Sequence, residues 1–246
     1  MTWNVLADAY IRPEYYPSVP PALLAPGVRT QAIAELVEAS DADVACLQEV
    51  EPAVLGALGA AGRWDVRRAK KRGKPDSCVI AARRRAAIEE VRTLAFADGA
   101  PDREDSGHVA LIAILTVATE RVQLATTHLR WERPGTPPAD RWTVRQAREL
   151  IDALDPDVPA IVCGDLNVDP HDEVYAMLLA AGLVDPCADG APTACTNGRA
   201  KRIDHVLHAR ELRGRVVPGL AIDDTTPLPS PVMPSDHLPV VVWFEA

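Results

Sequence analysis

The chain has 246 residues, of which 48% are hydrophobic, 25% are charged and only 4% are aromatic. This balance is typical of a globular protein, and the length suffices for one domain with a full core, spanning residues 1–246. No apolar run reaches the roughly 18 residues that a bilayer-spanning helix needs, and the N-terminus lacks the layout of a signal peptide. We therefore expect a cytoplasmic protein without a membrane partner. The five cysteines form no C-x-x-C pair, which disfavours disulfides and a zinc site.

The net charge of −9 is unevenly distributed along the chain. Residues 63–85, which we call the basic strip, contain ten lysines and arginines against only Asp65 and Asp76, a local charge of about +8. A basic strip on an acidic protein can hold a polyanion electrostatically. It can equally be a solvated loop and strand edge, and charge alone does not separate the two interpretations.

The first half of the chain alternates short apolar runs with two helical patterns. Residues 2–6 predict a strand, and residues 28–39 predict an amphipathic helix with Ile33, Leu36 and Val37 on one face. A buried strand is expected at residues 43–48, followed by a short helix that begins at Pro52. Three further strands are expected at residues 64–68, 77–82 and 87–94.

The second half begins with a predicted hairpin of residues 109–117 and 122–127, with its tip at 118–121. A long helix is expected over residues 138–154, a short buried strand at 160–163, and a helix at 172–180 that Gly182 stops. Strands are then expected at residues 202–207, 213–217 and 239–244. About ten strands and three or four helices predict an α/β fold with two packed β-sheets flanked by helices.

Polar side chains interrupt these apolar strands, follow them directly or, at Asp236 and His237, immediately precede one. They are Asn4, Glu49, Asp165, Asn167, Asp204, Asp236 and His237. A buried carboxylate without a partner is costly, so several that converge on one end of the sandwich would form an oxygen-ligand site. Carboxylates, amides and water are the ligands that Mg²⁺ prefers, with Mn²⁺ as the alternative ion.

Five segments, in order over nearly the whole chain, carry a family resemblance. They are TWNVLADAY (2–10), LQEVE (47–51), TTHLRW (126–131), CGDLNVDP (163–170) with RIDHVL (202–207), and PSDHLPV (234–240). Together they resemble the signature blocks of the endonuclease/exonuclease/phosphatase superfamily, and within it the branch of CCR4-type deadenylases, nocturnin and 2′-phosphodiesterase. The resemblance implies a DNase I-like, four-layer α/β sandwich and an enzyme that hydrolyses phosphate esters with Mg²⁺.

The resemblance implies a metal side and a base in the site. Glu49 would be the principal Mg²⁺ ligand, and Asp236 would complete the metal side. Asn4 would lie beside Glu49 and hold a phosphate oxygen or a metal-bound water. Asp165 would position and deprotonate the attacking water, and Asn167 would orient the Asp165 carboxylate.

The resemblance also implies a phosphate side. His237 would bind the scissile phosphate, Asp204 would fix the tautomer of His237, and His128 would stabilise the transition-state oxygens. These roles agree with the needs of phosphodiester hydrolysis, which are an in-line nucleophile and charge neutralisation on the phosphate oxygens.

Three further residues are candidates for contact with the substrate, namely Arg130, Trp131 and Asn197. Trp131 and Trp142 flank a Pro-rich loop and could stack on a base or simply pack, and we favour packing. Thr196 and Asn197 resemble a Thr-Asn element of the deadenylases. The aromatic segment that follows this element in those enzymes is replaced by residues 198–201, so no poly(A) preference is implied.

The sequence thus predicts a monomeric, Mg²⁺-dependent phosphodiesterase or exonuclease that acts on RNA or oligonucleotide 3′ ends. One alternative is a phosphatase of a small phosphomonoester or a phospholipid headgroup. A second alternative is a non-catalytic nucleic-acid-binding module. His108, His171 and His208 are expected to be structural.

Overall fold

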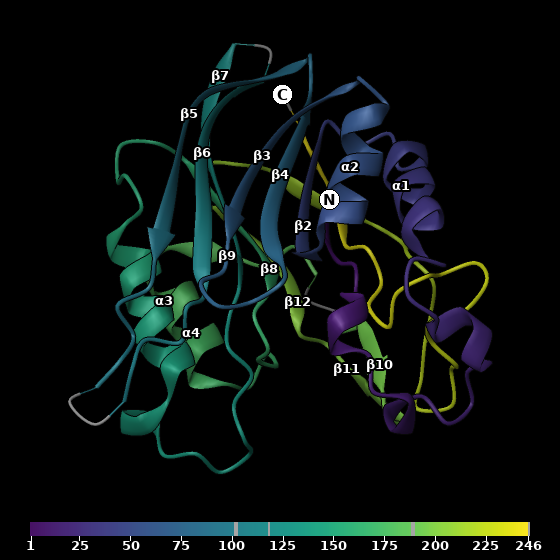
Figure 1. Ribbon diagram of the computed structural model, residues 1–246. Helices are drawn as coiled ribbons and strands as arrows, with labels where there is room; N and C mark the ends of the chain where they lie inside the picture. The colour runs from purple at the N-terminus through teal and green to yellow at the C-terminus, as the bar shows by residue number, and fades with distance from the viewer. Residues whose placement is uncertain (101–102, 118, 188–189, 246) are drawn as a thin grey trace.

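Two β-sheets face each other in this computed structural model, which describes the chain except residues 101–102, 118, 188–189 and 246 (Figure 1). The first sheet has four strands, in the order β1 (Thr2–Asn4), β2 (Val44–Val50), β4 (Ser77–Arg83) and β3 (Trp64–Lys70). The second has six, in the order β5 (Ala86–Ala95), β6 (Val109–Val117), β7 (Glu120–His128), β8 (Ala160–Asp165), β12 (Asp204–Ala209) and β9 (Leu183–Val184). Both sheets are mixed, because β1–β2 and β7–β8 pair in parallel and the other pairs are antiparallel.

Two short pairs of strands complete the β structure. One joins β10 (Ala194–Thr196) to β11 (Arg199–Lys201), and the other joins β13 (Gly214–Val217) to β14 (Val241–Phe244). The β10–β11 hairpin lies in a stretch without alternating apolar residues, so periodicity did not predict it.

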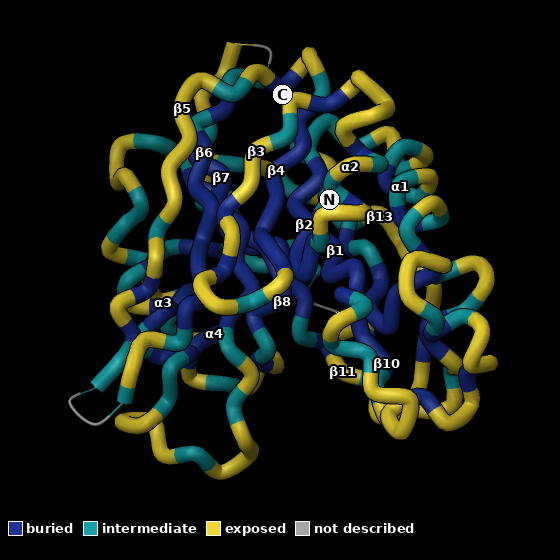
Figure 2. Tube along the Cα trace, viewed as in Figure 1, coloured by how far each residue is buried: buried dark blue, intermediate teal, exposed yellow. Residues whose placement is uncertain are grey.

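Four helices cover the outer faces of the two sheets. They are α1 (Thr30–Ala39), α2 (Pro52–Ala60), α3 (Trp142–Asp152) and α4 (Glu173–Ala180). Apolar residues of α1 and α2 pack on the four-stranded sheet, and those of α3 and α4 pack on the six-stranded sheet. A third apolar cluster, including Ile80, Leu111 and Val206, lies between the sheets. The inner strands are the buried part of the trace in Figure 2, whereas β5 and much of β3 are exposed. The predicted layered α/β sandwich is therefore confirmed.

Local sequence explains the boundaries of several elements. Pro52 occupies the first turn of α2, where its missing N–H leaves no hydrogen bond unmade. The carboxylate of Asp172 caps α4 by accepting from the backbone N–H of Val174 at 2.9 Å. Among the described residues, no helix is both long enough and apolar enough to cross a membrane.

The long helix predicted over residues 138–154 is wrong at its N-terminal end. Pro138–Asp140 form a short 3₁₀ turn, and Arg141 is extended, so α3 begins only at Trp142. The guanidinium of Arg141 donates to both carboxylate oxygens of Asp172, at 3.0 and 2.9 Å. This contact with the next helix lies far outside any helical repeat, and periodicity therefore could not predict the break.

Smaller differences occur at strand ends near the polar residues. The predicted strand of residues 2–6 ends at Asn4, because Leu6 has a left-handed backbone (φ 56°). The strand predicted at residues 202–207 instead spans Asp204–Ala209. The strand predicted to end at residue 163 continues to Asp165. Asn4 and Asp165 are thus the last residues of their strands, and Asp204 is the first residue of its strand.

Candidate active site

The ends of neighbouring strands bring the candidate residues together at one edge of the sandwich. In the six-stranded sheet, His128 pairs with Asp165 across β7 and β8, and Asp165 pairs with Asp204 across β8 and β12. In the facing sheet, Asn4 ends β1, and Glu49 lies one residue beyond its pairing partner on β2. Hydrogen bonds join the two groups across the sandwich, so both sheets build a single site.

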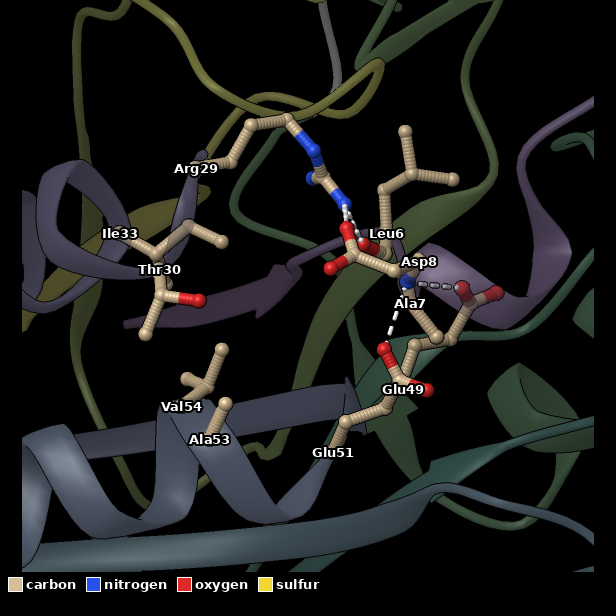
Figure 3. Close-up of a pocket in the computed structure, with 10 residues that line it drawn as sticks. All are labelled: Leu6, Ala7, Asp8, Arg29, Thr30, Ile33, Glu49, Glu51, Ala53 and Val54. Carbon is tan, nitrogen blue, oxygen red and sulfur yellow. Dashed lines mark hydrogen bonds and ion pairs between the residues drawn. The ribbon is translucent and has the colours of Figure 1, made fainter. Parts of the chain in front are cut away.

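Glu49 is turned into the site by its backbone. It has a φ of 60°, and the pairing of β2 with β4 shifts register between Leu47 and Val50. Bulges of this kind redirect a side chain, and strained backbone concentrates at functional sites. One oxygen of the Glu49 carboxylate accepts from Asn4 Nδ2 at 3.1 Å. The other accepts from the backbone N–H of Ala7 at 2.8 Å (Figure 3). Burial raises the pKa of this carboxyl group, and the charge of Lys71 and the hydrogen bonds from Ala7 and Asn4 oppose the rise.

Asn4 connects Glu49 to Asp165. Its amide nitrogen also donates to Asp165 Oδ2 at 2.9 Å, and its own oxygen accepts from the backbone N–H of Leu6 at 2.9 Å. The amide nitrogen of Asn4 therefore faces the site, which suits contact with a phosphate oxygen or a metal-bound water.

Asp165 lies at the centre of the cluster and is 2% exposed. Its Oδ1 accepts from the backbone N–H of Asn167 at 2.9 Å, and its Oδ2 faces Nε2 of both His128 and His237, at 3.6 and 3.8 Å. Burial raises the pKa of Asp165 to about 7, although the nearby His237 opposes this effect. A carboxyl group with a pKa near neutrality is suited to accept a proton at physiological pH.

Asn167 holds the segment that follows Asp165. Its backbone is left-handed (φ 54°), and its side-chain nitrogen donates to the backbone oxygen of Leu129 at 2.9 Å. This hydrogen bond joins the segment after β8 to the segment after β7. Asn167 therefore fixes the position of Asp165 relative to His128.

His237 and Asp204 form a buried pair. Asp204 Oδ2 accepts from His237 Nδ1 at 2.8 Å and from the hydroxyl of Thr193 at 2.7 Å. Burial lowers the pKa of His237, but the carboxylates of Asp204, Asp236 and Asp165 outweigh it and hold this pKa well above its ordinary value. These carboxylates therefore favour the protonated form of His237, whose Nε2 faces Asp165.

Asp236 presents one oxygen to the site. Its Oδ2 accepts from the hydroxyls of Tyr16 at 3.0 Å and Thr196 at 2.6 Å. Its Oδ1 lies 4.0 Å from His237 Nε2. This Oδ1 and Oδ1 of Asp204 are buried and accept no hydrogen bond from the described part of the chain.

The donor set fits a hard divalent cation. Glu49, Asp165 and Asp236 offer carboxylate oxygens, and the orphaned oxygen of Asp236 is costly to bury unless a cation or water binds it. Ligand atoms of Asp165, Asp204 and His237 also lie within 4.8 Å of one another. Within this cluster Asp204 holds His237 by a direct hydrogen bond, which fits a positioning role for Asp204.

Sequence reasoning missed several residues that touch the site, among them Thr193, Lys71 and Tyr16. The ammonium of Lys71 lies 3.1 Å from His128 Nδ1, and its side chain is only 1% exposed. Tyr16 binds Asp236 as described above. Lys71 belongs to a run of basic residues and Tyr16 to a Pro-rich segment, so neither had a local signal that predicted burial beside carboxylates.

The three candidate substrate residues differ in their surroundings. The guanidinium of Arg130 lies 3.9 Å from the ring centre of Trp142, and that of Arg103 lies 3.7 Å from the same ring. Trp142 is thus packed as expected, whereas Trp131 is 59% exposed and is not packed. Asn197 is exposed, and its backbone N–H donates to the oxygen of Tyr15 at 3.0 Å.

The basic strip forms the β3–β4 hairpin, and the open end of this hairpin differs from its turn end. Arg63, Arg83 and Arg85 form ion pairs with acidic residues between positions 38 and 43. The other end contains Lys71 beside His128 and Lys74 on the same turn. Lys71 at this turn end borders the site, whereas these arginines of the open end are paired with acidic residues of another segment.

A sandwich of this fold with carboxylates, amides and two imidazoles at one open edge defines a hydrolase of phosphate esters. The chain belongs to the Endonuclease/Exonuclease/phosphatase family, whose sequence pattern matches residues 1–237. The predicted resemblance is confirmed.

Two curated relatives match nearly the whole chain. The 2′,5′-phosphodiesterase 12 of Bos taurus is 24% identical over 98% of this chain and 50% of its own length. Nocturnin of Xenopus laevis is 26% identical over 99% of this chain and 71% of its own length. The chain thus spans about half the length of the first relative.

Solved structures support the same fold. ANGEL2, a 2′,3′-cyclic phosphatase, in complex with adenosine-2′,3′-vanadate, has a TM-score of 0.79 at 20% identity and covers 99% of this chain and 94% of its own. The human nocturnin catalytic domain with bound sulfate has a TM-score of 0.74 at 22% identity and covers 99% and 93%.

Proposed function

We propose that this protein is a Mg²⁺-dependent phosphodiesterase that hydrolyses ester bonds at the 3′ ends of RNA or oligonucleotides. The observation that carries the proposal is the position of Asp165. This carboxylate is buried between two imidazoles, and its pKa is raised to about 7. An attacking water bound to Asp165 would lie beside both groups that stabilise phosphate oxygens. Asp165 would then take the proton of this water as its oxygen attacks phosphorus in line.

The phosphate would be bound by donors that the site already orients. The neighbouring carboxylates favour the protonated form of His237, whose Nε2 would donate to the phosphate, and Asp204 accepts from Nδ1 of the same ring. His128 is a further donor beside the carboxylate of Asp165, and Asn4 orients the carboxylates of Glu49 and Asp165 by donating to both. Such donors stabilise the negative oxygens that gain charge in the transition state.

Glu49 and Asp236 would hold the cation, with Asp165 beside them. A bound Mg²⁺ supplies Lewis-acid stabilisation of the phosphate and of the leaving oxygen, and Mn²⁺ is the alternative ion. The orphaned oxygen of Asp236 supports this role, since no other described group satisfies it.

Two observations support a ribonucleotide substrate. The relatives include a 2′,5′-phosphodiesterase and a 2′,3′-cyclic phosphatase bound to an adenosine-2′,3′-vanadate, so the ester bonds they are named for lie at ribose 2′ and 3′ oxygens. Trp131 is exposed three residues after His128 and offers a face on which a base can stack. Arg130 and Asn197 are proposed as further contacts with the substrate. We also propose a cytoplasmic monomer built as one domain, which gel filtration of the full chain would test.

The test uses purified protein with three substrates, each with and without Mg²⁺. These are a 3′-labelled RNA, a 2′,5′-oligoadenylate and an RNA that ends in a 2′,3′-cyclic phosphate. The proposal predicts Mg²⁺-dependent product from at least one, abolished in Asp165→Asn and His237→Ala proteins that remain folded. Absence of product from all three would contradict the substrate class.

A second candidate function is hydrolysis of a small phosphomonoester or a phospholipid headgroup. The net charge of −9 and the neutralised end of the basic strip favour it, because a long polyanion would gain little from the paired arginines. Release of inorganic phosphate from a panel of metabolites would distinguish it from the first. A non-catalytic binding module is the remaining alternative, and the complete set of candidate residues in one site speaks against it.

A further inference from the structure

Lys71 is a buried cation at the edge of the site. It follows β3, and its side chain is 1% exposed. The ammonium lies 2.7 Å from Asp76 Oδ2 and 3.1 Å from His128 Nδ1. Asp76 is itself fully buried, and its Oδ1 accepts from the hydroxyl of Tyr10 at 2.6 Å. A continuous line of polar contacts therefore runs from Tyr10 through Asp76 and Lys71 to His128.

Stability alone does not account for this arrangement. The turn that carries Lys71 and Asp76 is already closed by their backbones, with Lys71 N–H donating to the Asp76 oxygen at 3.2 Å. The N–H of Arg72 also donates to the oxygen of Gly107 at 2.9 Å, which anchors the turn to a neighbouring segment. A buried ion pair adds little to stability compared with apolar side chains of the same size. The charged pair therefore calls for another explanation.

The chemistry of the ammonium determines the protonation of the histidine. A lysine ammonium has three donors and no acceptor, so His128 Nδ1 must be the acceptor in their contact. The proton of a neutral His128 is then on Nε2. This Nε2 lies 3.6 Å from Asp165 Oδ2 and faces the position proposed for the phosphate.

Without Lys71, the opposite tautomer would have a partner. His128 Nδ1 lies 3.7 Å from Glu49 Oε1, so a proton on Nδ1 could be donated to Glu49 instead. Nε2 would then face the site as an acceptor and would repel the negative oxygens of a phosphate. The contact with Lys71 occupies Nδ1 and excludes this arrangement.

We propose that Lys71 is a positioning residue that holds His128 in the tautomer with its proton on Nε2, so that His128 donates to an oxygen of the substrate. The effect on catalysis rests on the proposed function, whereas the tautomer itself does not depend on the substrate. Asp76, oriented by Tyr10, holds the ammonium against the ring.

The test combines nitrogen NMR with kinetics on the full chain. Protein with ¹⁵N-labelled histidine is compared as wild type, Lys71→Met/Asp76→Asn and Lys74→Met. The double variant removes both buried charges, so neither is left without its partner, and the new amide at position 76 retains an oxygen for Tyr10. Lys74→Met removes a charge from the same turn without touching His128. A Lys71→Arg variant tests whether another obligate donor restores the tautomer.

In wild type and Lys74→Met, His128 is expected to show an acceptor-type Nδ1 resonance and a protonated-type Nε2 resonance. In the double variant this pattern is expected to change, with kcat lowered by about 10- to 100-fold and KM within about threefold, as for the loss of one transition-state donor. A protonated Nδ1 in wild type would overturn the proposal. So would an unchanged pattern and an unchanged kcat in the folded double variant. Failure of every substrate, with the expected resonances present, would count against the proposed function and leave the tautomer assignment standing.

Discussion

Replacing Asp204 with Asn removes one buried negative charge and leaves the shape of the side chain almost unchanged. Only Oδ2 of Asp204 accepts hydrogen bonds, from His237 Nδ1 and the Thr193 hydroxyl, while Oδ1 has no partner in the described part of the chain. An amide nitrogen can therefore take the place of Oδ1 without loss of an accepted hydrogen bond. The substitution tests the charge on Asp204 separately from its geometry.

The magnitude follows from the hydrogen bond at 2.8 Å between His237 and Asp204. A hydrogen bond to a charged group contributes about 1.5–3 kcal/mol, whereas a neutral one contributes about 0.5–1.5 kcal/mol. The difference of about 1–2 kcal/mol corresponds to a loss of about 5- to 30-fold in kcat/KM. The pKa of His237 should also fall, because Asp204 is the foremost of the three carboxylates that raise it. His237 then loses its proton at a lower pH, so activity should decline at a lower pH than in wild type.

The assay is kcat/KM as a function of pH, with whichever phosphate ester the wild-type protein hydrolyses. Thr193→Val is the matched control, because it removes the other donor to the same oxygen and keeps the charge of Asp204. Thr193→Val removes a neutral donor to Asp204 and the oxygen that accepts from the backbone N–H groups of Ile203 and Asp204, but no charge, so we expect it to stay within about threefold of wild type. If Asp204→Asn stays within about twofold of wild type at every pH, the assignment of Asp204 as the partner that sustains a cationic His237 is refuted.

Four further predictions concern other parts of the site and of the fold. Asp165→Asn should lower kcat by at least about 100-fold. The wild-type rate should rise with pH to a midpoint at or below about 7, because burial raises the pKa of Asp165 to about 7 and only the carboxylate accepts a proton. A rate that is flat across this range argues against Asp165 as the base. Mg²⁺ at about 100 times its Kd should stabilise the wild type by about 2.7 kcal/mol and raise its Tm by about 5–10 °C. In a thermal-shift assay, Glu49→Gln should lose most of this increase in Tm. An equal increase in the variant would exclude Glu49 as the principal ligand. Trp131→Ala should raise KM for an oligonucleotide by about fivefold or more. Trp243 on β14 has a similarly exposed ring, and Trp243→Ala should leave KM unchanged. Equal effects of the two substitutions would show that Trp131 does not contact the substrate. Gly164→Ala should lower the Tm measured by calorimetry by about 6–12 °C. The φ of 140° at Gly164 is strained for other residues, and a Cβ there would overlap a backbone oxygen of β7. An unchanged Tm would show that β7 and β8 can separate at no cost.

Several features of the fold follow from local sequence. The helix at residues 172–180 was predictable because Asp172 caps its first turn and Gly182 follows its end. The strands that carry the site were predictable because buried strands consist of uninterrupted apolar residues, and the polar residue that breaks such a run marks its end. Glu49 and Asp165 were identified in this way before any contact was known.

Other features depended on contacts between distant segments. The break before α3 accompanies the ion pair of Arg141 with Asp172, which no local repeat encodes. Two arginines pack on Trp142, one of them 39 positions away in the chain, whereas Trp131 is 59% exposed. The two tryptophans are equivalent in a local reading, because packing is decided by residues that are remote in sequence.

The sequence by itself determined the family, the layered α/β class and the identity of the polar residues at the strand ends. Only the tertiary structure decided how those residues act on one another. It places Asp165 between two imidazoles, raises the pKa of His237 through three carboxylates, and buries Lys71 against His128. The physical reason is that charge and protonation depend on burial and on neighbours a few ångströms away, and these neighbours come from different strands of two sheets.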